Sequence, residues 1–138
     1  MDTLFRIHSD LRWLIVAVAV LAVIRLAVGW LRRESTYDRA SSMLMQLFAI
    51  GVDVQVLVGL VYFIWSGLDV EGGYWPRERF EHLVVMLIAA GVAHLPRRWR
   101  SAPAPLRYRN DALAVIAVLV IVFVGVVLLP GGTNRWKF

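Results

Sequence analysis

Two histidines beside long apolar runs are the residues best suited to chemistry. His8 lies in HSDLRW, about one helical turn before Trp13 opens the first apolar run, and His82 lies in FEHLVVM near the start of the third. Imidazole is an axial ligand of haem iron, so two histidines at one depth on different helices can bind one iron from both faces. We predict that His8 and His82 ligate one haem b. The alternatives are hydrogen bonding to loops, another ligand, or catalytic proton transfer.

Basic residues gather near the same end of the expected helices. Arg12 follows His8 by four residues and therefore shares its helix face. Cationic side chains form strong charge-assisted hydrogen bonds with carboxylates, such as the propionates of haem. The candidates for this contact are Arg12, Arg77, Arg79, Arg135 and Lys137.

Small and polar residues form stripes on the second and third apolar runs. Gln55 and Gly59 belong to a stripe on the second run, and Met86 shares a face with His82 on the third. Such faces let another helix, or the edge of a planar cofactor, approach the backbone closely. Gln55 and Gly59 are therefore candidate cofactor contacts. Met86 is expected either to ligate iron or to fill space.

His94 is expected to have a different role from the other two histidines. It lies roughly 18 Å deeper than His82 along a helix and about 120° around it. It also stands immediately before Pro96 and a cluster of arginines. We expect His94 to end its helix by meeting a terminal carbonyl or a lipid headgroup, and we predict no second haem.

Arg25 and Asp53 are charged residues inside apolar runs. Each is costly alone in lipid, so the economical expectation is that they form an ion pair. A proton path or a contact with quinone is the alternative use of these charges.

Four long apolar runs must position these residues, and each is typical of a transmembrane helix. They predict an all-α, integral membrane four-helix bundle that forms a single domain over residues 1–138. Asp2 or Thr3 can begin the first helix, Pro76 the third, and Asn110 or Asp111 the fourth. The expected helices cover approximately residues 5–31, 42–66, 77–95 and 111–129.

The charges indicate how the bundle is oriented. The chain has 15 Lys and Arg against 10 Asp and Glu, but the arginines cluster between the apolar runs, which is a topology signal and not a nucleic-acid surface. The two arginine-rich connections are expected to be cytoplasmic, so both chain ends and the loop 67–75 face outward. There is no cysteine, which excludes disulfides, iron–sulfur clusters, cysteine-ligated zinc and covalent haem c.

Three segments resemble a known family. HSDLRW, QVLVGLVYF and EHLVVMLIA look like small bacterial four-helix membrane proteins often labelled cytochrome b-like. The chain departs from that pattern at Asp53, where several such proteins have a histidine, and this leaves His8 and His82 as the natural pair. The layout is also similar to bacterial haem-containing protoporphyrinogen oxidases, which have a lysine where this chain has His82. The matching positions are His8, Leu11, Arg12, Trp13, Gln55, Leu57, Gly59, Leu60, Tyr62, Glu81, His82, Met86 and Ala89.

Three functional classes follow from these observations and the resemblance. The first is a b-type haem protein of the bacterial inner membrane, which passes electrons as a small or accessory subunit of a respiratory or photosynthetic complex. The second is a haem-dependent oxidoreductase that acts on a quinone or a porphyrin. The third is a structural transmembrane subunit without a cofactor. The expected partners are lipid and other membrane subunits, with quinone as a further candidate and no nucleic acid.

Overall fold

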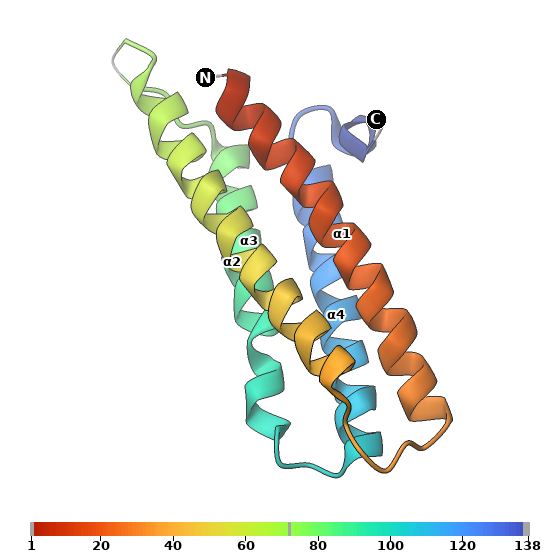
Figure 1. Ribbon diagram of the computed structural model, residues 1–138. Helices are drawn as coiled ribbons and strands as arrows, with labels where there is room; N and C mark the ends of the chain where they lie inside the picture. Colours follow the sequence, from red (N-terminus) through yellow and green to blue (C-terminus); the bar gives the residue numbers. More distant parts are fainter. Residues whose placement is uncertain (1, 72, 137–138) are drawn as a thin grey trace.

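The chain folds as an all-helical bundle, which confirms the predicted fold class. A computed structural model describes residues 2–71 and 73–136 of the 138-residue chain. Four long helices run up and down, and two short 3-10 helices follow the third and the fourth (Figure 1). The elements are α1 (Asp2–Leu31), α2 (Arg39–Leu68), α3 (Arg77–Ala93), η1 (Leu95–Trp99), α4 (Ala104–Val127) and η2 (Gly132–Trp136).

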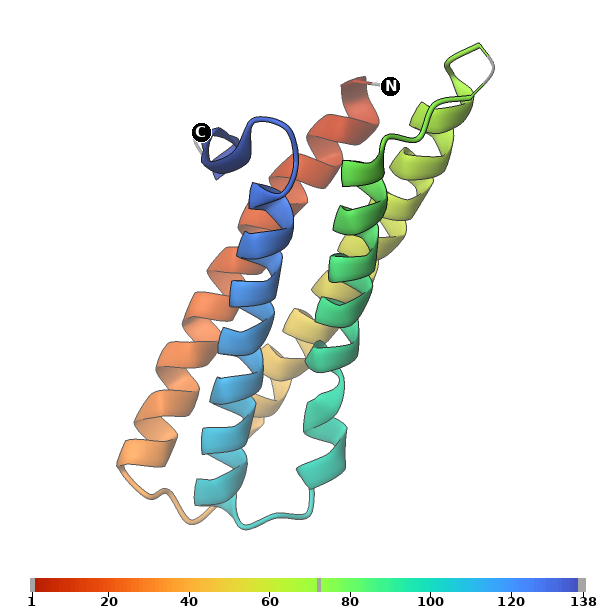
Figure 2. The same ribbon diagram turned by 180° about the vertical axis from the view of Figure 1, so that it is seen from behind.

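The four helices form a ring. α1 packs against α2 and α4, and α3 packs against the same two helices, so α1 and α3 face each other across a diagonal. The start of α1, η2 and the described parts of the loop between α2 and α3 lie at one end of the bundle, which we call the terminal end (Figure 1). The loops 32–38 and 100–103 lie at the other, which we call the arginine end. η1 continues α3 toward the arginine end (Figure 2).

Each of the four helices is long and apolar enough to cross a membrane. The spans are Thr3–Leu31, Arg39–Leu68, Arg77–Trp99 and Ala104–Val127. Their outward surfaces are covered with exposed large apolar side chains, which a bilayer would solvate. The chain is therefore a multi-pass membrane bundle.

The helix boundaries differ from the expected ones mainly at α4. It begins at Ala104 after Pro103, so the expected start at Asn110 or Asp111 is wrong. The charged stretch before the apolar run continues the helix, and Asp111 is only 1% exposed. α3 begins directly after Pro76, as expected, and ends two residues early at Ala93. α2 begins earlier than expected because the Asp38 side chain caps it by accepting a hydrogen bond from the Ser41 backbone N–H at 3.0 Å.

The hydrophobic core lies mostly toward the arginine end. In the described part of α1, Ala19 is the first buried residue, and on α3 it is Ala89. Between these levels and the arginine end, small alanines let the helices pack around larger side chains, chiefly Leu26, Phe48 and Tyr108. Toward the terminal end the helices enclose space instead.

Candidate functional site

A cavity of about 650 Å³ occupies the terminal half of the bundle. Its walls come from all four long helices and from the segment that follows α4. It brings together six of the residues that the sequence assigned to a cofactor: His8, Arg12, Gln55, Gly59, His82 and Met86. Its volume falls in the range of cavities that enclose a cofactor-sized molecule.

The deeper part of the cavity is apolar. On α1 the lining residues extend from Phe5 to Val16, and on α3 from Glu78 to Ala89, which is about 16 Å of helix in each case. Phe48, Val52 and Val118 line this deeper region. The charged wall residues are three arginines and one glutamate, so the polar part of the cavity is basic: Arg12, Arg79, Arg135 and Glu78.

His82 is held in a single tautomer. Its Nδ1 lies 2.8 Å from the carbonyl oxygen of Gly125. Because a carbonyl can only accept, Nδ1 must carry the proton, and Nε2 keeps a free lone pair. α3 and α4 approach closely here, since a Cβ on Gly125 would lie 2.9 Å from Val85 Cγ1. No spacing pattern in the sequence singles out Gly125, although it is the single glycine of α4.

His8 lies against the stripe on α2. The Gln55 side-chain amide donates to the His8 carbonyl oxygen at 2.9 Å, and its nitrogen lies 3.4 Å from His8 Nε2. A Cβ on Gly59 would lie only 2.8 Å from His8 Cε1, so glycine makes room for the ring. His8 Nδ1 and Gln55 Oε1 are buried with no hydrogen-bond partner among the described residues. Two polar atoms beside the cavity therefore lack a hydrogen-bond partner among the described residues.

Aromatic pairs close the sides of α2 near the terminal end. Phe5 and Tyr62 join α1 to α2 with ring centroids 5.7 Å apart. Phe63 and Phe80 join α2 to α3 edge to face at 5.0 Å. Phe5, Tyr62 and Phe63 also line the cavity.

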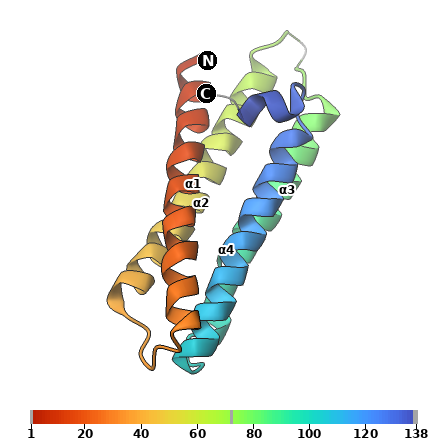
Figure 3. The ribbon, with the colours of Figure 1, turned by 90° about the vertical axis from the view of Figure 1, so that its right-hand side faces the viewer.

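The segment after α4 turns back toward α1 (Figure 3). Its residues Leu129, Pro130 and Arg135 line the cavity. Arg12 Nη2 donates to the Arg135 carbonyl oxygen at 2.8 Å, which ties this segment to α1. Arg79 donates to the Ser66 hydroxyl at 2.8 Å. Of the other candidate propionate contacts, Arg77 pairs with Glu81 on an exposed surface at 2.6 Å, and Lys137 lies outside the described residues.

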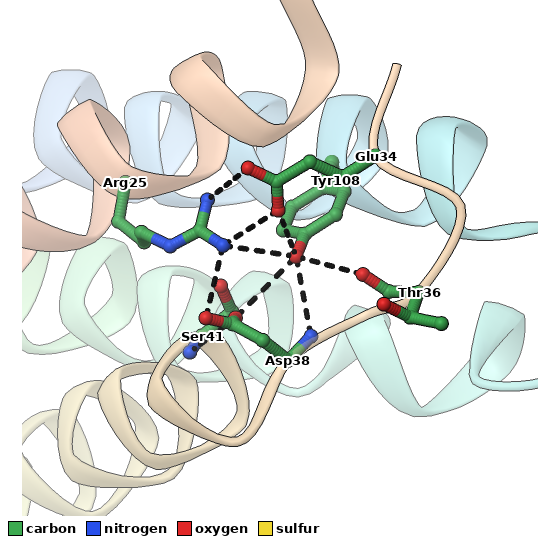
Figure 4. A network of polar contacts seen from close by, with 6 residues as sticks. All are labelled: Arg25, Glu34, Thr36, Asp38, Ser41 and Tyr108. Atoms are coloured by element: carbon green, nitrogen blue, oxygen red, sulfur yellow. Dashed lines mark hydrogen bonds and ion pairs between the residues drawn. The ribbon is translucent and has the colours of Figure 1, made fainter. Parts of the chain in front are cut away.

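The expected pair of Arg25 with Asp53 is wrong. Arg25 Nη2 instead lies 2.7 Å from Glu34 Oε2 and 2.9 Å from Asp38 Oδ2 (Figure 4). The loop 32–38 folds back along α1, so its carboxylates reach the level of Arg25. The expected pair was derived from the positions of Arg25 and Asp53 along straight helices, which carry no information on the path of the loop.

The Arg25 network alters the acidity of the loop. The hydrogen bond from Arg25 lowers the pKa of Glu34. Burial alone would raise the pKa of Asp38, but hydrogen bonds from Ser41 and Arg25 outweigh it and lower the pKa from 3.8 to about 2. The Tyr108 hydroxyl stands at the centre of the same network, as Figure 4 shows.

Asp53 has a different partner. His94 Nε2 lies 2.8 Å and 3.0 Å from the two Asp53 carboxylate oxygens. The expectation that His94 meets a helix-end carbonyl or a headgroup is therefore wrong. Asp53 faces α3 and not α1, and α3 ends where its last turn can present His94 to it. The pair lies outside the set of cavity-lining residues.

Asp111, which the sequence indicated only as a possible helix start, is a second buried polar centre. It accepts hydrogen bonds from the Tyr37 hydroxyl and from Trp99 Nε1, both at 2.6 Å. Arg107 lies over the Tyr37 ring, 3.6 Å from its centroid. Burial, followed by the hydrogen bond to the Asp111 carboxylate, raises the pKa of Tyr37. These contacts join the loop 32–38, η1 and α4.

Within residues 2–71 and 73–136, no three His, Cys, Asp or Glu side chains cluster as ligands of a metal ion. Comparisons of the chain with protein-family models, curated proteins and solved structures found no match.

Proposed function

We propose that the chain is a small b-type haem protein of the bacterial inner membrane. In this proposal one haem lies in the terminal-end cavity between His8 and His82. The protein passes electrons as a subunit of a respiratory or photosynthetic membrane complex. The observation that carries the proposal is the placement of the two histidines. They come from the diagonal helices α1 and α3 and line one cavity of about 650 Å³.

The environment of His82 supports metal ligation. A ligating histidine usually donates its other ring N–H to a carbonyl or carboxylate, which sets the tautomer and the ring orientation. His82 makes this bond to Gly125 at 2.8 Å. The nitrogen that would bind iron is therefore already the unprotonated one.

The environment of His8 also fits a ligand. Buried polar atoms are normally paired, so an unpaired one invites an explanation. His8 Nδ1 and Gln55 Oε1 both lack a partner among the described residues, and Gly59 gives the ring space. Iron bound at one ring nitrogen would leave the other as a hydrogen-bond donor, and the Gln55 side chain already lies 3.4 Å from His8 Nε2.

The cavity has an apolar part and a basic part, which match the apolar ring and the anionic propionates of haem. Its deep wall of Ile15, Phe48, Val52 and Ala89 suits an apolar macrocycle edge. Arg79 and Arg135 would supply positive charge to the propionates. Bound haem would supply reversible one-electron transfer at iron, while the chain provides ligation, orientation and exclusion of water.

The orientation in the membrane belongs to the same proposal. The arginine end carries eight arginines, at positions 32, 33, 39, 97, 98, 100, 107 and 109, against five near the terminal end, at positions 6, 12, 77, 79 and 135, or six basic residues with Lys137 of the tail. By the positive-inside rule the arginine end is cytoplasmic and the haem lies near the outer surface. A cysteine at Ser101 should resist an impermeant thiol reagent in intact cells and react once the cells are opened. Labelling in intact cells would reverse the orientation.

The test of haem binding is an absorption spectrum after haem-replete expression. We expect a low-spin spectrum for the wild type and its loss in both His8→Ala and His82→Ala. His94→Ala is the matched control and should keep the spectrum, because His94 binds Asp53 outside the cavity. A colourless wild type would favour a structural subunit without cofactor. A spectrum that survives both single substitutions would exclude these two ligands.

A further inference from the structure

Asp53 and His94 form a polar pair within the transmembrane spans. The proposed haem site does not use this pair. Asp53 is fourteen residues into α2 from Arg39, or about 21 Å of helix. Its side chain is 50% exposed and that of His94 is 29% exposed. Ionisable groups within membrane spans are costly and usually face protein or water. A half-exposed carboxylate on the outer surface of the bundle therefore needs further polar contact.

The surface around this pair has other features that lipid alone does not require. On α2, Gln46, Ile50, Asp53 and Leu57 are all exposed and share one helix face by their spacing. Beside them on α3, Gly91 is exposed, and a Cβ there would meet no atom of the described chain within 4 Å. Glycine at such a position lets a helix from another molecule approach closely. We call this surface, with His94, the α2–α3 face.

We propose that the α2–α3 face binds a second copy of the same chain about a two-fold axis. Its polar groups are self-complementary. When His94 is protonated, one ring N–H bonds Asp53 of its own chain, and the other is a donor for Asp53 of the second copy. Each carboxylate has lone pairs for both donors.

Gln46 fits the same symmetry. Its carboxamide both donates and accepts, so two copies of Gln46 can satisfy each other. A two-fold interface places the same patch on both sides, which is the commonest arrangement of soluble homo-oligomers. A basic helix from a different protein would pair with Asp53 but would compete with His94 for it.

Cysteine crosslinking in native membranes tests this interface cleanly, because the chain contains no cysteine. Leu57→Cys, on the α2–α3 face and 61% exposed, should crosslink into a species of twice the 15.6 kDa chain mass. Leu21→Cys on α1 is the matched control, since it is 58% exposed on a different surface. We expect several-fold more dimer from position 57 than from position 21.

Two further changes, each made in the Leu57→Cys background, test the cause. Asp53→Asn removes the charge of the pair, and Gly91→Leu blocks close approach in a place where the chain itself offers no clash. Both should lower the dimer several-fold while the protein remains in the membrane. Equal crosslinking at positions 57 and 21, or a dimer that neither change weakens, would overturn the proposal. A crosslink only to a different protein would also overturn it.

Discussion

The two ends of the bundle differ in what lies beside their buried polar groups. At the arginine end, the Tyr108 hydroxyl is within hydrogen-bond reach of Arg25, Glu34, Thr36 and Asp38, and Asp111 accepts two bonds at 2.6 Å. At the terminal end, His8 Nδ1 and Gln55 Oε1 lack partners within the described chain and border a cavity. Two buried atoms of the arginine end also lack hydrogen bonds there, Ser41 Oγ and Arg107 Nε, but neither lines the cavity.

This difference separates structural polar groups from those available to a ligand. A network in which each centre makes several hydrogen bonds makes the local structure rigid and specific, because a substitution there leaves a buried group unpaired. Unpaired polar atoms beside a cavity differ in this respect, because a bound molecule can supply their missing hydrogen-bond partners. Substitutions at the two ends should therefore have different consequences, and four experiments test this.

The largest loss of stability should come from Asp111→Ala. The change leaves the Tyr37 hydroxyl and the Trp99 indole N–H without their acceptor in a buried place. Two stranded donors should lower the free energy of unfolding by about 4 kcal/mol. Unfolding of the purified protein by denaturant in mild detergent measures this. Stability equal to wild type would mean that the arginine end is not held by this centre.

Tyr108→Phe should have a smaller effect at the same end. It removes one fully buried hydroxyl from the network but keeps the ring and its packing. We expect a loss of about 1 to 2 kcal/mol in the same assay, since a hydrogen-bonded hydroxyl contributes roughly that amount. A loss as large as that of Asp111→Ala would contradict the ranking of the two centres.

Gln55→Leu should change stability little and ligand binding much. The substitution removes one hydrogen bond to the His8 carbonyl but also removes the unpaired Oε1. The free energy of unfolding of the haem-free protein should stay within about 0.5 kcal/mol of wild type. Haem should nevertheless dissociate faster, as measured by transfer to apomyoglobin. A large stability loss without any change in haem transfer would remove the contrast between the two ends.

The last effect is the dependence of the arginine end on acid, which solvent screening reduces because the Asp38 side chain is 37% exposed. The pKa of Asp38 in the folded protein is about 2, below its ordinary 3.8, so its charge stabilises the folded state above about pH 4. This contribution is lost as the pH falls from 3.8 through about 2. Asp38→Asn retains a good helix cap and removes only the charge. Its stability difference from wild type should therefore shrink toward zero over that window, and a constant difference would argue against the assigned pKa.

The sequence predicted most of the site because periodicity carries over directly into helix faces. His8, Gln55, Gly59, His82 and Met86 were grouped by depth and by helical spacing, and all of them line one cavity. That grouping needed only four helices packed side by side. Whether iron binds there remains a prediction.

The sequence could not identify the partners of its charged residues. Arg25, Asp53 and His94 all pair differently from expectation, and Asp111 was taken as a helix start although it is buried. Each of these contacts depends on the path of a loop or on the rotation of one helix against another. Neither leaves a periodic signal in the chain.

The amino-acid sequence by itself determined the number of helices, their membrane character and the end at which His8 and His82 lie. Apolar runs and helical spacing are local properties of the chain. Tertiary structure alone decided that the terminal half is hollow and the arginine half is filled. It also decided that the loop 32–38 returns to Arg25 and that Gly125 fixes the tautomer of His82. These features depend on how side chains from distant segments pack against one another. That packing is defined only when all four helices are in place.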